Sequence, residues 1–245
     1  MSTARMPTVG ALPDWGISTD DLTAAWKATD AFLADLPGTF GMDAAGFYSV
    51  LSLRNTSGFI GEVFKHAVAS RAVGLALNPH ADGRPDLLDV RAPEAARFLT
   101  SECIDSAGGP LRARLAPFPH GGVEVKCSIG KSPKGAGEMP PGVSRRRVVK
   151  GLTYWAHHRH ACNLLGVYYD FDEAAGGAPQ IKAIFMAPVE EDHWQRVSTG
   201  RPDRKKTSNT SLTSAGVSRV VAGLVAFDPE PACVEMLERI GAPVS

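Results

Sequence analysis

The chain has 245 residues, of which 44% are hydrophobic and 21% charged, so it carries enough apolar material to bury a sizeable core. This composition excludes disordered and fibrous proteins. No segment reaches the roughly 18 consecutive apolar residues of a membrane-spanning helix, and the N-terminal residues lack the apolar core of a secretory signal. Its four cysteines are widely spaced and form no CxxC pair. We therefore expect a cytoplasmic protein with reduced thiols and no membrane partner.

The charged residues are balanced in number, 26 of each sign, but they are unevenly placed. Between positions 126 and 159, eight basic residues accompany a single acidic one, Glu138, and a second basic group lies at 201–206. Such local excesses are typical of surfaces that bind a polyanion. An ordinary solvated loop is the alternative for the later segment. The residues predicted to contact DNA are Lys131, Lys134, Arg145, Arg146, Arg147, Lys150, Arg204, Lys205, Lys206, Thr207, Ser208 and Asn209.

Four segments show the apolar spacing of helices. The first begins with a cap at Thr19 or Asp20 and ends near Pro37, with Phe32 on its apolar side, and residues 1–45 are interpreted as a peripheral helical cover. The second follows Ser57-Gly58 and carries Glu62 beside an apolar stripe at 59–68. A third helix is predicted over 92–102 and a fourth over 143–162, the fourth with a basic outer face.

Short apolar and β-branched runs predict strands at 72–77, 87–90, 122–127, 164–171, 181–187 and 220–227. No internal repeat and no linker rich in Pro, Gly or Ser divides the chain. We predict a single domain over 1–245, of the mixed α/β class, in which helices flank a central mixed sheet.

Two short motifs carry the candidate chemistry. Pro85-Asp86 precedes the strand predicted at 87–90, and Glu124-Val125-Lys126 lies in the strand predicted at 122–127. Strand alternation places the Glu124 carboxylate and the Lys126 ammonium on one side of the sheet. If Asp86 enters from the neighbouring strand, two carboxylates and the backbone carbonyl of Val125 can bind a hard cation such as Mg²⁺.

Together the two motifs resemble the signature of the PD-(D/E)XK nuclease superfamily. The resemblance implies a restriction-endonuclease-like core and Mg²⁺-dependent hydrolysis of phosphodiester bonds in DNA, leaving 5′-phosphate and 3′-hydroxyl ends. It implies that Asp86 and Glu124 hold the metal and that Lys126 orients or helps to deprotonate the attacking water. It also implies a further carboxylate, Glu62, on the helix that precedes the strands.

The long separation of Asp86 from Glu124 departs from the family pattern, whose hairpin is shorter. We expect an insertion that contains the helix at 92–102. Asp89 and Asp105 are alternative first ligands, although Asp89 points to the opposite face of its strand and Asp105 lies in a turn-like sequence. An exposed ion pair on an edge strand is the alternative interpretation of the Glu-Val-Lys triplet.

Other kinds of site find less support. His158 and Cys162 are four residues apart on the helix predicted over 143–162 and could chelate zinc, but no second Cys/His pair completes a site. Phosphate contact is the role expected for this histidine cluster. GxSxG, GxxxxGK(S/T) and well-placed GxGxxG motifs are missing, so neither a serine nucleophile nor a nucleotide cofactor is expected.

These patterns favour a type II restriction endonuclease that cleaves double-stranded DNA at a specific sequence. One active site cuts one strand, so we expect a homodimer. Base reading is predicted for residues 201–214, where Arg, Lys, Asn, Ser and Thr predominate. A structure-selective or modification-dependent nuclease of the same superfamily is the alternative among enzymes. A noncatalytic DNA-binding protein with a nuclease-like fold is the alternative from another class.

Overall fold

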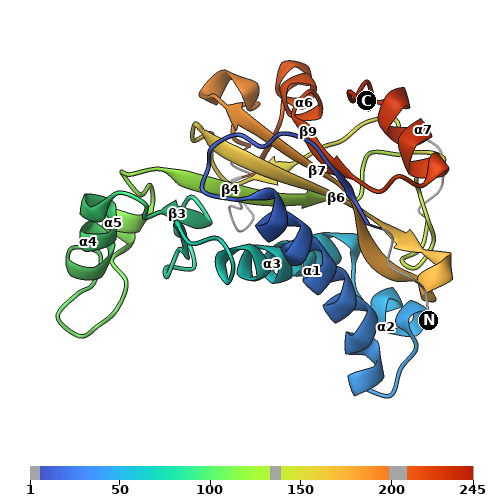
Figure 1. Ribbon diagram of the computed structural model, residues 1–245, viewed down its shortest axis with the longest axis horizontal. Coiled ribbons are helices and arrows are strands. Elements are labelled where there is room, and N and C mark those ends of the chain that lie inside the picture. The colour runs from blue at the N-terminus through green and yellow to red at the C-terminus, as the bar shows by residue number, and fades with distance from the viewer. Residues whose placement is uncertain (1–5, 133–138, 199–208, 245) are drawn as a thin grey trace.

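The computed structural model describes residues 6–132, 139–198 and 209–244. These residues form a seven-stranded mixed sheet with helices on both faces, which confirms the predicted mixed α/β class (Figure 1). None of the helices in these three ranges is long and apolar enough to cross a bilayer. Lys134 and the basic tract at 204–208, both predicted to bind DNA, lie outside the described residues.

The main sheet has the spatial order β1-β9-β7-β6-β4-β3-β2. Strands β4 and β6 pair in parallel, and the other neighbours are antiparallel. The bounds are β1 (Thr8–Val9), β2 (Leu75–Leu77), β3 (Leu87–Asp89), β4 (Gly122–Ser128), β6 (Cys162–Asp172), β7 (Ala178–Val189) and β9 (Leu224–Phe227).

Three helices, α1 (Thr19–Thr39), α2 (Ala44–Ser49) and α3 (Leu53–Ala69), precede the long strands, and α1 and α3 cover one sheet face (Figure 1). The cap of helix α1 is Ser18, one residue before Thr19 and two before Asp20, the predicted caps. The Ser18 hydroxyl accepts from the Asp21 N–H, and the Asp21 carboxylate accepts from the Ser18 N–H. Its Leu22 and Trp26 are buried in the core, whereas Phe32, expected on the inner side, is 45% exposed.

The opposite face is covered by α6 (Ser214–Val221) and α7 (Pro231–Arg239), whose apolar side chains join one core cluster with β6 and β7. The strand predicted over 220–227 is therefore partly wrong, because Val220 and Val221 belong to α6. Those two valines are buried against the sheet. Apolar burial alone does not separate the end of a short helix from the start of a strand.

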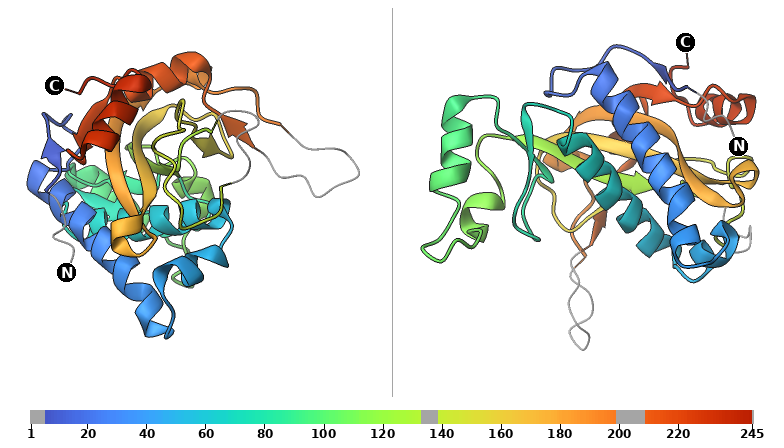
Figure 2. Two further views of the ribbon diagram at one scale, coloured as in Figure 1. Left: turned by 90° about the vertical axis from the view of Figure 1, so that its right-hand side faces the viewer. Right: turned by 60° about the horizontal axis from the view of Figure 1, so that its bottom comes forward.

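The expected insertion lies between β3 and β4 and projects beyond the end of the sheet (Figure 2). It contains α4 (Pro93–Ser101), which confirms the helix predicted over 92–102, and α5 (Arg112–Leu115). A small core of its own includes Ala95, Leu115 and Phe118. The chain returns through Gly122, where φ is 146° and a Cβ would lie 2.0 Å from the Leu87 carbonyl oxygen, so only glycine fits.

The helix predicted over 143–162 is wrong. This segment is a run of turns and extended chain, with the two-residue strand β5 (Trp155–Ala156) paired to β8 (Thr210–Ser211). The Asp170 carboxylate of β6 accepts hydrogen bonds from the backbone N–H groups of Arg145 and Arg146, so a partner distant in sequence satisfies these groups. The remaining short elements are the 3₁₀ turns η1 (Glu173–Ala175) and η2 (Glu191–His193).

Candidate functional site

A cleft of about 870 Å³ lies along β4. Strand β3 pairs with β4 only as far as Val123, so within the described ranges no strand lies beside the rest of that β4 edge. Helix α3 lines the cleft from one sheet face and residues 153–158 line it from the other. The loop at 81–84, between β2 and β3, and Arg112 of the insertion also line it. The charged side chains on its walls are Arg54, Glu62, Lys65, Asp82, Arg84, Asp86, Arg112, Glu124 and Lys126.

Glu124 forms the floor of this cleft and is only 4% exposed. One carboxylate oxygen, Oε1, lies 2.5 Å from the Lys126 ammonium and 3.3 Å from Nε2 of His158. The other, Oε2, is buried and has no hydrogen-bond partner among the residues that the structure describes. Burial alone would raise the pKa of Glu124, but Lys126 and His158 outweigh it and lower the pKa to about 2. A carboxylate that stays charged and keeps one unpaired buried oxygen is suited to bind a cation.

Asp86, the residue directly before β3, reaches the Val125 backbone and Lys126 from the neighbouring strand. Its Oδ2 accepts a hydrogen bond of 2.9 Å from the Val125 N–H and lies 3.6 Å from the Lys126 ammonium. Burial raises the pKa of Asp86, the Glu124 charge adds to the shift, and Lys126 opposes it. The N–H and C=O of one strand residue face the same edge, so the Val125 carbonyl faces the open edge too. The predicted convergence of Asp86, Glu124 and Lys126 is therefore present.

Lys126 lies between the two carboxylates, and its side chain is 22% exposed. Burial favours the neutral amine, but Glu124 and Asp86 outweigh it and raise the pKa of Lys126 above its usual value. The side chain is therefore a fixed positive charge at neutral pH. This geometry suits charge stabilisation better than the abstraction of a proton from water.

Helix α3 contributes a second lysine that neither sequence motif contains. The Lys65 ammonium lies 2.8 Å from Glu62 and 3.5 Å from Asp86 Oδ1. Glu62 does line the cleft, as expected, but its side chain is 62% exposed. Its ion pair is with Lys65, which in turn lies near Asp86. Helical spacing places Lys65 on the Glu62 side of α3, which was the available signal for it.

His158 has a different role from the one considered for zinc. Because 143–162 is not helical, His158 and Cys162 do not share a helix face. The backbone N–H of His160 donates to Nδ1 of His158, so the ring proton sits on Nε2 and points to Glu124 Oε1. This contact holds Oε1 and orients the carboxylate, so that Oε2 is the oxygen left without a partner among the described residues.

The alternative first ligands lie elsewhere. Asp89 accepts hydrogen bonds from the Arg91 guanidinium, and these lower the pKa of Asp89. The same guanidinium also forms an ion pair with Asp14. Asp105 accepts from the N–H groups of Ala107 and Gly109 in its own turn. Neither lines the cleft, so Asp86 is the acid that the structure brings to Glu124.

The predicted DNA contacts divide into two groups. Lys131, Arg147 and Lys150 are exposed, and the backbones of Lys131 and Lys150 are hydrogen-bonded to each other just beyond the cleft-lining Gly130. Asn209 lines the cleft itself. Arg145 and Arg146 are buried instead, at 7% and 9% exposure, which corrects the expectation of a solvent-facing basic helix.

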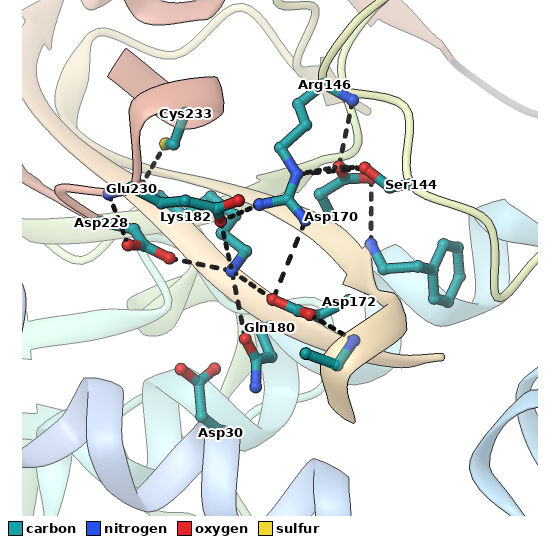
Figure 3. A network of polar contacts seen from close by, with 12 residues as sticks. Asp30, Ser144, Arg146, Asp170, Asp172, Gln180, Lys182, Asp228, Glu230 and Cys233 are labelled. Atoms are coloured by element: carbon teal, nitrogen blue, oxygen red, sulfur yellow. Dashed lines mark hydrogen bonds and ion pairs between the residues drawn. The ribbon is translucent and has the colours of Figure 1, made fainter. Parts of the chain in front are cut away.

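Arg146 belongs to a second set of charges, here called the buried ionic network (Figure 3). Lys182 on β7 donates to Asp172 at 2.8 Å and to Asp228 at 2.9 Å. Arg146 pairs with Glu230 and approaches Asp170. The network joins the 143–149 segment, β6, β7 and the start of α7, and Glu230, at 27% side-chain exposure, is its most exposed member. Its members are Arg146, Asp170, Asp172, Lys182, Asp228 and Glu230.

In the described part of the chain, no three His, Cys, Asp or Glu side chains converge as a metal-binding group. A cation held by Asp86 and Glu124 would therefore share its remaining ligands with a backbone carbonyl, water and substrate, which is the usual arrangement for Mg²⁺ beside a phosphate. The unpaired Oε2 of Glu124 fits such an ion. No protein-family model, no curated protein and no solved structure matches this chain.

Proposed function

We propose that this protein is a metal-dependent nuclease that hydrolyses phosphodiester bonds in DNA. The observation that carries the proposal is Glu124: a charged carboxylate on the cleft floor, with one oxygen held by Lys126 and His158 and the other unpaired. The contacts of Asp86 with Val125 and Lys126 supply the second carboxylate that the motifs led us to expect.

Asp86, Glu124 and the Val125 carbonyl are the groups that would hold Mg²⁺. When bound there, the ion would lower the pKa of a water and offset charge on the phosphate. Lys126 holds its proton and would stabilise the excess negative charge that develops as water attacks phosphorus and the ester oxygen leaves. Lys65 and Arg54 line the α3 wall, where cations can position the phosphates on either side of the reacting one.

The surroundings of the cleft favour a polyanionic substrate over a small ester. Lys131, Arg147 and Lys150 extend the positive charge beyond the cleft, where adjacent backbone phosphates would lie. A type II restriction endonuclease is the class that we propose first, acting in the cytoplasm as a homodimer so that both strands of a duplex are cut. A structure-selective nuclease is the second proposal, because an exposed tryptophan lines the same cleft.

The decisive experiment compares the wild type with Glu124→Gln on plasmid DNA in the presence of Mg²⁺. The Gln variant keeps the shape of the side chain but removes its charge, so cleavage should fall about 10²- to 10³-fold while DNA binding persists. Removing the metal with EDTA should stop cleavage by the wild type. Glu62→Gln is the matched control. This exposed carboxylate contacts Lys65 and not Lys126, so its replacement should reduce cleavage less than Glu124→Gln does.

The products separate the proposals. Discrete fragments from unmodified DNA would support the restriction enzyme, and cleavage confined to unpaired or branched DNA would support the structure-selective nuclease. Wild-type activity that survives in Glu124→Gln would refute this site. DNA binding without any cleavage would favour the noncatalytic DNA-binding protein.

A further inference from the structure

One aromatic side chain in the cleft has no structural role that accounts for its position. Trp155 is 56% exposed, whereas Trp26 and Trp194 are 4% and 2% exposed. Several other large apolar side chains of the described ranges are exposed, but only Trp155 among them lines the cleft. An indole ring left in water loses the burial that normally stabilises it.

The backbone beneath Trp155 is firmly anchored. Its neighbours Tyr154 and Ala156 are buried in the core cluster of the α6 and α7 face, so strand alternation turns Trp155 outward. The Tyr154 ring lies over Gly166, where a Cβ would come within 2.9 Å of it. Trp155 is also paired with Ser211 across the β5–β8 ladder. The ring is therefore presented to the cleft from a rigid support.

The distance to the candidate reaction centre is short. His158 follows Trp155 by three residues and contacts Glu124, and three residues of extended chain span at most ~10 Å. Trp155 and Arg54 line the same cleft, and Asn209 precedes the strand that pairs with β5. An aromatic face that shares a cleft with a guanidinium and an amide is a combination that can bind a nucleobase by stacking and hydrogen bonding.

We propose that Trp155 is the stacking platform for an unpaired nucleobase, so that the strand entering the cleft is single-stranded beside the scissile phosphate. This inference rests on the proposed nuclease function, and it favours the structure-selective nuclease over the restriction endonuclease. Bases in an intact duplex keep their faces stacked on one another, and an indole can reach such a face only where the strand is open. The substrate is then single-stranded DNA or duplex DNA with a locally opened strand.

The test measures tryptophan fluorescence during titration with short DNA in EDTA, which prevents cleavage. A thymidine oligomer should quench the wild type. An abasic oligomer of equal length and charge should quench it much less, as should a fully paired duplex. Trp155→Leu should lose the quenching and weaken binding of the thymidine oligomer about tenfold to a hundredfold, and Trp155→Phe should retain most of the affinity. Phe40→Leu is the control for loss of an exposed aromatic ring that does not line the cleft.

Equal quenching by the abasic oligomer, or unchanged affinity in Trp155→Leu, would overturn the stacking site. Equal quenching by the closed duplex would overturn the requirement for an open strand. Glu124→Gln should quench like the wild type, since the platform does not need the metal. Base-dependent quenching without any Mg²⁺-dependent cleavage would therefore contradict the nuclease proposal and support the base-binding site. Cleavage without base-dependent quenching would support the nuclease proposal and contradict the base-binding site.

Discussion

The molecule contains two clusters of opposite charges that differ in their completeness. In the buried ionic network, the side chains of Lys182 and Asp170 are at most 2% exposed, and no buried polar atom of its six members lacks a partner (Figure 3). In the cleft, Lys126 is partly exposed and Glu124 keeps an unpaired oxygen. Full pairing is what a buried structural cluster requires, whereas a ligand site keeps a polar atom without a protein partner. Charge alone would not have distinguished the two.

The largest effect on stability is expected from Lys182→Met. The change leaves Asp172 and Asp228 buried without their common cation, which should cost about 3–5 kcal/mol of unfolding free energy. Lys65→Met is the matched change in the cleft. It removes interactions near solvent and should cost less than about 1 kcal/mol. Urea denaturation of both variants gives the comparison, and equal destabilisation would mean that the two clusters are equally structural.

Activity should show the opposite order. Lys126→Met removes the charge between Asp86 and Glu124 and should reduce cleavage about 10²- to 10³-fold. Lys182→Met, assayed at a temperature where it is folded, should cleave at close to the wild-type rate per folded molecule. Rates measured at saturating DNA decide this, and full activity in Lys126→Met would remove the assigned role.

A third prediction concerns Asp30, which accepts hydrogen bonds from Trp26 and Ile181 between α1 and β7. Burial raises the pKa of Asp30 from 3.8 to about 7, so the folded protein keeps this proton where the unfolded chain releases it. Its contribution to stability is complete below pH 3.8 and is lost as the pH rises toward 7. Asp30→Asn should flatten the pH dependence of unfolding free energy between these values, as chemical denaturation at several pH values would show. An unchanged slope would contradict the shift.

The smallest effect is expected at the exposed basic residues. Arg147→Gln with Lys150→Gln should leave stability within about 0.5 kcal/mol and weaken binding to all DNA sequences alike. The slope of log affinity against log salt should become shallower by roughly 0.9 for each phosphate that the variant no longer neutralises. Lys27→Gln, an exposed lysine on α1, is the control and should not change the slope. The same slope in all variants would place the DNA elsewhere.

The local patterns of the chain were enough to predict much of the candidate site. Strand alternation placed Glu124 and Lys126 side by side, and the Pro-Asp pair before β3 placed Asp86 near them. The mixed α/β class followed from the order of helical and strand periodicities. These features depend on residues near one another in sequence or on the pairing of two short strands.

Only the tertiary structure determined the conformation of the segment from 143 to 162. Its basic residues and apolar spacing are compatible with a helix. In the structure, however, Arg146 is buried by its contacts with Asp170 and Glu230, and Glu230 lies 84 residues away from it in the chain. The same folding turns Trp155 outward and brings His158 to Glu124. Sequence periodicity describes which side chains share a face, whereas the partner that each face meets is set by packing between distant elements.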